Sequence, residues 1–88
     1  MQPSLNHNVK HKDTIYHVQT EDRGSRNPIF QTDVFYEGKI IHSFQQEYKP
    51  NQKPEVIKQF MIEQHKFVIR QLMNGEFDEE IIKLCQTR

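Results

Sequence analysis

Apolar and polar positions alternate through the first half of the chain, as they do in strands that bury one face. The clearest case is the second strand, in which Tyr16, Val18 and Thr20 fall on one face. The pair Glu37-Gly38, between two further extended stretches, is typical of a hairpin turn. These patterns predict three antiparallel strands in a meander, or four with a short edge strand. The candidate strands span residues 9–12, 14–22, 29–36 and 39–48, so the predicted sheet covers residues 9–48.

The hairpin at Glu37-Gly38 admits two registers. A two-residue loop pairs Phe35 with Ile40. A three-residue loop, with Gly38 in the left-handed bulge position, pairs Val34 with Ile40 instead. We predict the second register because it gathers the more apolar face. That face contains Phe30, Val34, Ile40 and Phe44, with Thr32 and His42 between them.

The second half of the chain changes to a helical period. Asn51 suits an N-cap, Pro54 suits a first helical turn, and Gly75 suits a helix end. Asp78 suits the cap of a further helix, whose acidic first turn complements the helix dipole. The predicted helices span residues 54–74 and 78–86.

The long predicted helix carries two apolar stripes. The first stripe is expected to face the sheet. It consists of Ile57, Phe60, Met61, Val68 and Leu72. The second stripe consists of Ile62, Ile69 and Met73. Either the short last helix folds back over this second stripe, or the stripe stays open for a partner or for a second copy of the chain.

Together these elements predict a single α+β domain over residues 1–88. An antiparallel sheet of three to four strands is followed by a long C-terminal helix packed on one face and by a short final helix. Residues 1–8 are polar and are expected to be frayed. A chain of 88 residues can build one small core.

Charge and composition narrow the classes of partner. Twelve basic residues are balanced by twelve acidic ones, whereas a nucleic-acid binder needs a basic surface, so we predict no nucleic-acid partner. No apolar run approaches the roughly 20 residues of a membrane span, so we predict no membrane partner. The one cysteine, Cys85, cannot form an internal disulfide, and the N-terminal residues contain no apolar signal segment. Both features favour a cytoplasmic location.

The residues that could carry chemistry are not arranged for it. The five histidines do not show the spacing of a zinc site. His7 and His11 would lie about 13 Å apart on an extended segment. The sequence contains none of the common nucleophile or nucleotide-binding motifs, and no base is placed near Cys85. We therefore predict no catalytic activity, no metal and no cofactor.

Charged residues gather in two places that could recognise a partner. Glu21 and Asp22 precede a turn-rich loop with Arg23 and Arg26, and loops on a rigid sheet often carry binding residues. The alternative is an ordinary solvated surface, whose ion pairs contribute about 0–1 kcal/mol each. The second place is a mixed-charge patch on the long helix, beside its second stripe. The candidate partner-binding residues are Glu21, Asp22, Arg23, Arg26, Ile62, His65, Lys66, Ile69 and Met73.

The heptapeptide of residues 16–22 resembles a motif in a family of short bacterial proteins. It reads Tyr16-His17-Val18-Gln19-Thr20-Glu21-Asp22. Further similarities, spread over residues 12–80, include Gly24, Asn27-Pro28, Thr32, Val34-Phe35, Gly38, Ile40, Tyr48, Glu63-Gln64-His65-Lys66 and Gly75-Glu76-Phe77-Asp78. The family occurs in bacteria with gliding or type IV pilus motility and is similar to RomX-type polarity proteins.

This resemblance implies a module that acts with a scaffold protein to stimulate nucleotide exchange on a Ras-like GTPase. Such a factor binds one state of the GTPase better and shifts its population. Glu21 or Asp22 could then compete with a phosphate or disturb the Mg²⁺ site. We therefore predict a protein–protein interaction module that regulates a Ras-like GTPase in cell polarity or motility. The alternative is a homodimeric structural module that pairs through the second helix stripe.

Overall fold

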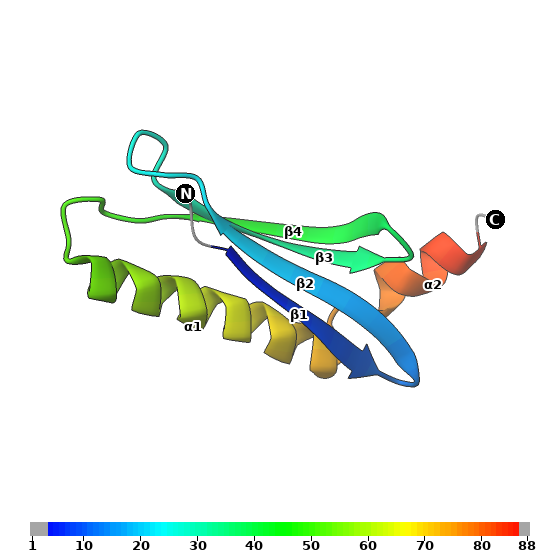
Figure 1. The fold of residues 1–88 in the computed structure, drawn as a ribbon. Coiled ribbons are helices and arrows are strands. Elements are labelled where there is room, and N and C mark those ends of the chain that lie inside the picture. Colours follow the sequence, from blue (N-terminus) through cyan, green and yellow to red (C-terminus); the bar gives the residue numbers. More distant parts are fainter. Residues whose placement is uncertain (1–3, 87–88) are drawn as a thin grey trace.

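The computed structural model describes residues 4–86, which form one sheet and two helices (Figure 1). The strands are β1 (Ser4–His11), β2 (Thr14–Asp22), β3 (Ile29–Tyr36) and β4 (Lys39–Glu47), and the helices are α1 (Pro54–Met73) and α2 (Asp78–Gln86). Neighbouring strands are antiparallel and follow the order β1-β2-β3-β4. The predicted α+β meander is confirmed, with four strands.

β1 is longer than the short edge strand predicted from the sequence. It pairs with β2 from Ser4, opposite Glu21, to His11, opposite Thr14. The expectation that residues 1–8 are frayed is therefore wrong from Ser4 onward, and residues 1–3 lie outside the described part. The reason is the ladder with β2, which gives the backbone of this polar segment its hydrogen-bond partners.

Both hairpins turn on two residues that have positive φ. Lys12 and Asp13 have φ of 49° and 64°, and Glu37 and Gly38 have φ of 49° and 79°. Positive φ at both central positions is the mark of a type I′ turn, whose twist matches that of the strands it joins. The strands can therefore pair closely up to each turn.

The β3–β4 hairpin takes the two-residue loop, so the predicted three-residue loop is wrong. Phe35 pairs with Ile40, and the register then shifts so that Val34 pairs with His42. The residue left out of the pairing, Ile41, packs against the core, while Ile40 is exposed. The irregularity acts as a bulge and restores the rest of the predicted face. The restored face contains Phe30, Thr32, Val34, His42 and Phe44.

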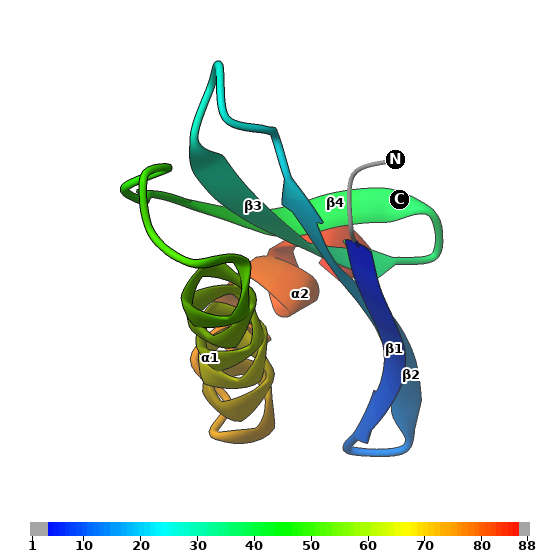
Figure 2. The same cartoon turned by 60° about the vertical axis from the view of Figure 1, so that its left-hand side comes forward.

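The inner face of the sheet packs against α1. Tyr16, Val18 and Thr20 are buried on one face of β2, as predicted. Figure 2 shows α1 on the concave side of the strongly twisted sheet, where it contacts β1, β2 and β3. The core therefore lies between α1 and the inner face of the sheet, and it extends to Phe77 beyond the end of α1.

α1 is rotated about its own axis relative to the predicted stripe. Met61, Val68 and Leu72 are buried as predicted, but Phe60 is half-exposed. Gln64 and His65 are buried beside the apolar residues instead. These two polar side chains find hydrogen-bond partners in the sheet. Burying them therefore loses little free energy, and the aromatic flank of the helix turns outward.

The ends of α1 follow from particular residues. The helix begins at Pro54, as predicted, but its N-cap is Lys53 rather than Asn51, and no side-chain cap bond forms. Gly75 follows the helix with φ of 81°. A Cβ added at Gly75 would lie 3.0 Å from Oδ2 of Asp78. Both the positive φ and this contact favour glycine at the end of the helix.

α2 lies beyond the C-terminal end of α1, against the end of the sheet (Figure 1). The buried Phe77 stacks on His42, with ring centroids 4.2 Å apart. The carboxylate of Asp78, predicted as a helix cap, contacts Nζ of Lys12 and lies 3.1 Å from Nε2 of His11. The Lys12 ammonium and His11 together hold the pKa of Asp78 below its usual range. These contacts tie α2 to the turn end of both hairpins.

α2 therefore does not fold back over the second stripe of α1. Ile69 packs against the core, Ile62 is half-buried, and Met73 is 51% exposed. Within residues 4–86, neither helix is both long and apolar enough to cross a bilayer.

Candidate functional site

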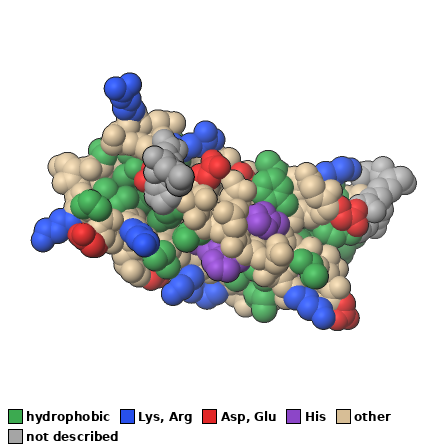
Figure 3. Space-filling view, in the orientation of Figure 1, with side chains coloured by type: hydrophobic (Ala, Val, Ile, Leu, Met, Phe, Trp, Pro, Cys, Tyr) green, Lys and Arg blue, Asp and Glu red, His purple; other side chains and the backbone are tan. Residues whose placement is uncertain are grey.

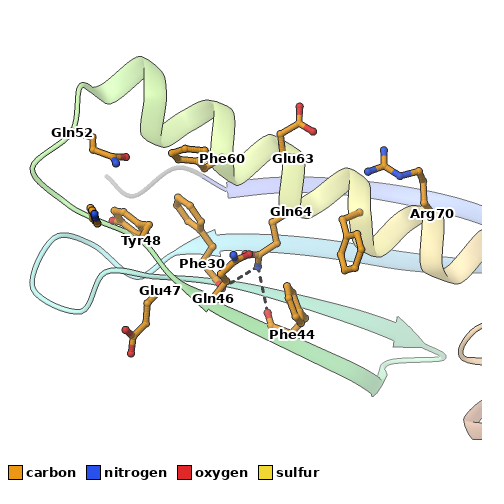
Figure 4. Close-up of a pocket in the computed structure, with 12 residues that line it drawn as sticks. Phe30, Phe44, Gln46, Glu47, Tyr48, Gln52, Phe60, Glu63, Gln64 and Arg70 are labelled. Carbon is orange, nitrogen blue, oxygen red and sulfur yellow. Dashed lines mark hydrogen bonds between the residues drawn. The ribbon is translucent and has the colours of Figure 1, made fainter.

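Two exposed aromatic side chains lie on the flank of α1 opposite to the second stripe. Phe60 and Phe67 on this flank are 50% and 43% exposed. They border an open groove of about 860 Å³ between α1 and the segment from β4 onward (Figure 4). We call it the aromatic groove. Its ring-bearing lining residues are Phe30, Phe44, Tyr48, Phe60 and Phe67.

The rings of the aromatic groove come from both layers of the fold. Phe44 of β4 contacts Phe67 of α1, with ring centroids 5.8 Å apart. Phe30 of β3 stacks on Tyr48 at 4.2 Å, and in Figure 4 Phe60 faces these two rings from the helix. Aromatic walls offer a large contact area and lose little side-chain entropy on binding. The groove is therefore suited to hold apolar side chains.

Tyr48 connects the aromatic groove to the charged loop after β2. Its hydroxyl donates a hydrogen bond to Oδ1 of Asp22, and the same oxygen accepts the N–H of Gly24 at 2.8 Å. Burial, and then the Asp22 carboxylate, raise the pKa of Tyr48 to about 12. The phenol thus stays protonated, and Asp22, a predicted partner-binding residue, orders the loop at one end of the groove.

Gln64 brings a polar group to the aromatic groove. Its Nε2 donates to the carbonyl oxygen of Phe30 and to Oγ1 of Thr32, each at 3.0 Å. Only the amide nitrogen can face these acceptors, so the orientation of the side chain is fixed. The other amide atom, Oε1, is buried and has no hydrogen-bond partner among the described residues. A buried acceptor of this kind is stabilised by any ligand that donates a hydrogen bond to it.

His65 was predicted to lie on the helix surface as a partner-binding residue. Instead it is buried in a chain of hydrogen-bonded polar groups. Its Nδ1 lies 2.7 Å from Oγ1 of Thr20, which lies 2.7 Å from Oγ1 of Thr32. Its Nε2 lies 2.8 Å from Nδ1 of His7. Burial first, and then the nearby His7 and His17, lower the pKa of His65 to about 4. A neutral imidazole can accept at one nitrogen and donate at the other, which suits both neighbours.

The other predicted charged residues are accessible but are not brought to the aromatic groove. Glu21 accepts a hydrogen bond from Gln19 at 2.9 Å, and Arg23 donates to Gln31. Arg26 is exposed in the loop after β2. Figure 3 shows Lys and Arg dispersed among Asp and Glu over one face of the molecule. The loop residues therefore form a mixed-charge border rather than a patch of one sign.

The predicted helix residues lie on the far flank of α1 from the groove. Lys66 and Met73 are exposed there, while Ile62 and Ile69 are half-buried. The structure therefore separates the predicted partner-binding residues into the loop, this flank and the buried His65. The prediction missed the aromatic groove because it assigned Phe60 to the core. The spacing of seven residues between Phe60 and Phe67 could have indicated a common flank.

Neither comparisons with known proteins nor a test for a metal site assigns a function to the aromatic groove. Searches against protein-family models, curated proteins and solved structures found no match to this chain. Among the described residues, His, Cys, Asp and Glu side chains do not gather in a group of three that could hold a metal ion. The side chain of Cys85 lies outside the described part.

Proposed function

We propose that this chain is a protein-interaction module that binds through the aromatic groove between α1 and β4. The observation that carries the proposal is the pair of half-exposed rings, Phe60 and Phe67, beside Phe44. A contiguous exposed apolar surface of this kind is typical of protein-interaction sites. Oε1 of Gln64, which has no hydrogen-bond partner within residues 4–86, adds a polar contact that could orient an apolar segment of the partner.

The finer proposal is that the partner is a Ras-like GTPase and that binding stimulates nucleotide exchange. Its support is the resemblance carried by residues 16–22, the last two of which are Glu21 and Asp22. Asp22 is already hydrogen-bonded to Tyr48 and Gly24. We therefore assign to the exposed Glu21 the role of competing with a phosphate or disturbing the Mg²⁺ site of the GTPase. The charged loop and the groove are continuous through Tyr48, so one partner could contact both.

Calorimetric titration with the candidate GTPase, nucleotide-free and GDP-loaded, tests both proposals. We expect tighter binding to the nucleotide-free state. The double variant Phe60→Ser with Phe67→Ser should weaken binding by at least about tenfold, or roughly 1.4 kcal/mol. Its fold should persist because both rings are already half-exposed. Glu21→Ala should slow nucleotide release and leave the fold unchanged.

The matched control is Met73→Ser, because Met73 has a similar exposure of 51% but lies on the opposite flank of α1. It should bind as the unmodified chain does. Equal loss in Met73→Ser and in the double variant would contradict binding through the groove. Absence of binding to both states of the GTPase would remove the finer proposal.

A further inference from the structure

We infer that the aromatic groove is closed by a second copy of this chain, whose β4 pairs antiparallel with β4 of the first. The inference rests on the proposed function because it names an occupant for the same groove. The two copies would form one continuous sheet of eight strands with both α1 helices on the same side. Any other partner of the groove would then have to displace the second copy.

The first support is the open edge of β4, which ends the strand order β1-β2-β3-β4 in the described residues. The N–H of Tyr48 donates to the carbonyl of Pro28 at 2.9 Å, on the β3 side. Backbone groups alternate in direction along an antiparallel strand. Ser43, Gln45 and Glu47 therefore direct their N–H and C=O groups away from β3. An unpaired edge of this kind is a template for another strand.

The second support is the way in which a paired copy would fill the aromatic groove. Phe44 and Gln46 of β4 turn their side chains toward the groove, and the same residues of an antiparallel copy would point to the same face of the joined sheet. α1 reaches β4 at Phe44, through Phe67 and Gln64, while the neighbouring Gln46 is exposed and leaves room beside it for side chains of the second copy. Phe60 and Phe67 of both copies would occupy the space between the two helices. The exposed rings would thereby become a shared core.

The third support is the charge along the rim of the groove, which is self-complementary. Glu63 and Arg70 are exposed, lie about two turns apart on α1 and stand on either side of Phe67. Phe67 contacts Phe44 near the middle of the open edge. A two-fold axis at this level brings Glu63 of each copy toward Arg70 of the other, as an isologous interface requires. The formal net charge of zero removes overall repulsion between the copies.

Sedimentation equilibrium of the full chain, from micromolar to millimolar concentration, tests the inference. We expect the mass to rise to twice the 10.6 kDa of the chain. Gln45→Pro removes an outward N–H and leaves the bonds to β3 intact, so this variant should stay monomeric. Lys10→Pro is the matched control because it makes the same change at the outer edge of β1, and it should still dimerise.

A charge exchange keeps the inference testable if the proline variant does not fold. Glu63→Arg should abolish the dimer, because it sets Arg against Arg70 of the other copy, and adding Arg70→Glu should restore it. A chain that is monomeric at every concentration overturns the inference. So does a dimer that withstands both Gln45→Pro and Glu63→Arg. A monomer that loses GTPase binding in the double variant Phe60→Ser with Phe67→Ser overturns the second copy and leaves the proposed function standing.

Discussion

At the scale of single residues, burial decides the chemistry of His65. The side chain lies between Thr20 and His7, and its pKa of about 4 keeps the imidazole neutral at pH 7. A neutral ring can join the hydroxyl chain to the edge of β1 without placing a charge in the core. The residue therefore has a structural task that its position in the sequence pattern did not reveal.

This burial makes the stability of the fold depend on pH. Since the pKa of His65 is lower in the folded protein than its ordinary value of 6.5, the unfolded chain takes up a proton first as the pH falls. The contribution of His65 is complete above pH 6.5 and is lost as the pH falls toward 4. The slope approaches about 1.4 kcal/mol per pH unit. Urea unfolding at several pH values measures it, and His65→Gln should flatten the slope. An unchanged slope in this variant would contradict the assignment.

At the scale of elements, the two type I′ turns set the geometry of both hairpins, but their residues differ in suitability. Gly38 adopts its φ of 79° without strain, whereas Lys12 and Asp13 hold positive φ with a Cβ. We expect Asp13→Gly to stabilise the protein by up to about 1 kcal/mol, since glycine is preferred at this position. Thermal unfolding measures the change. A lower melting temperature in Asp13→Gly would show that the strain is offset elsewhere in the turn.

The elements also show what sequence periodicity can and cannot predict. The strands β2, β3 and β4, the position of the turn at Glu37-Gly38 and the start of α1 at Pro54 follow from local residue types and were predicted, whereas the length of β1 and the loop type of that turn were not. The rotation of α1 was not predicted, because it depends on hydrogen bonds from Gln64 and His65 to Thr32 and Thr20, which are remote in sequence. The bulge at Ile41 was not predicted either, because the two-residue alternation of a strand does not reveal one extra residue.

The candidate site depends on the rotation of α1. Once α1 is rotated, Phe60 and Phe67 leave the core and meet Phe44 at the side of the sheet. The predicted open stripe around Ile69 is instead partly taken up by the core. Sequence reasoning correctly expected more apolar surface on the helix than the sheet covers. It placed the excess on the second stripe, where Met73 is exposed, and missed the flank with Phe60 and Phe67 because it could not weigh buried hydrogen bonds against apolar burial.

At the scale of the whole molecule, zero net charge and an exposed aromatic flank act together. The isoelectric point is about 7.0, so electrostatic repulsion between molecules is weakest near neutral pH. We expect a solubility minimum near pH 7, with higher solubility on both sides. Precipitation by polyethylene glycol across the pH range measures it. The double variant Phe60→Ser with Phe67→Ser should be more soluble at the minimum, and a pH-independent solubility would contradict the expectation.

The meander order of the sheet has a consequence for how the chain reaches its fold. Each strand pairs with the strand that precedes or follows it, and β1–β2 and β3–β4 are joined by only two residues. Closing such short loops loses little chain entropy. Folding rates rise as contacts become more local in sequence, so both hairpins can form before the long-range contacts of α1 and α2. We therefore expect α1, which completes the core, to dock last, on a sheet surface that the hairpins have already formed.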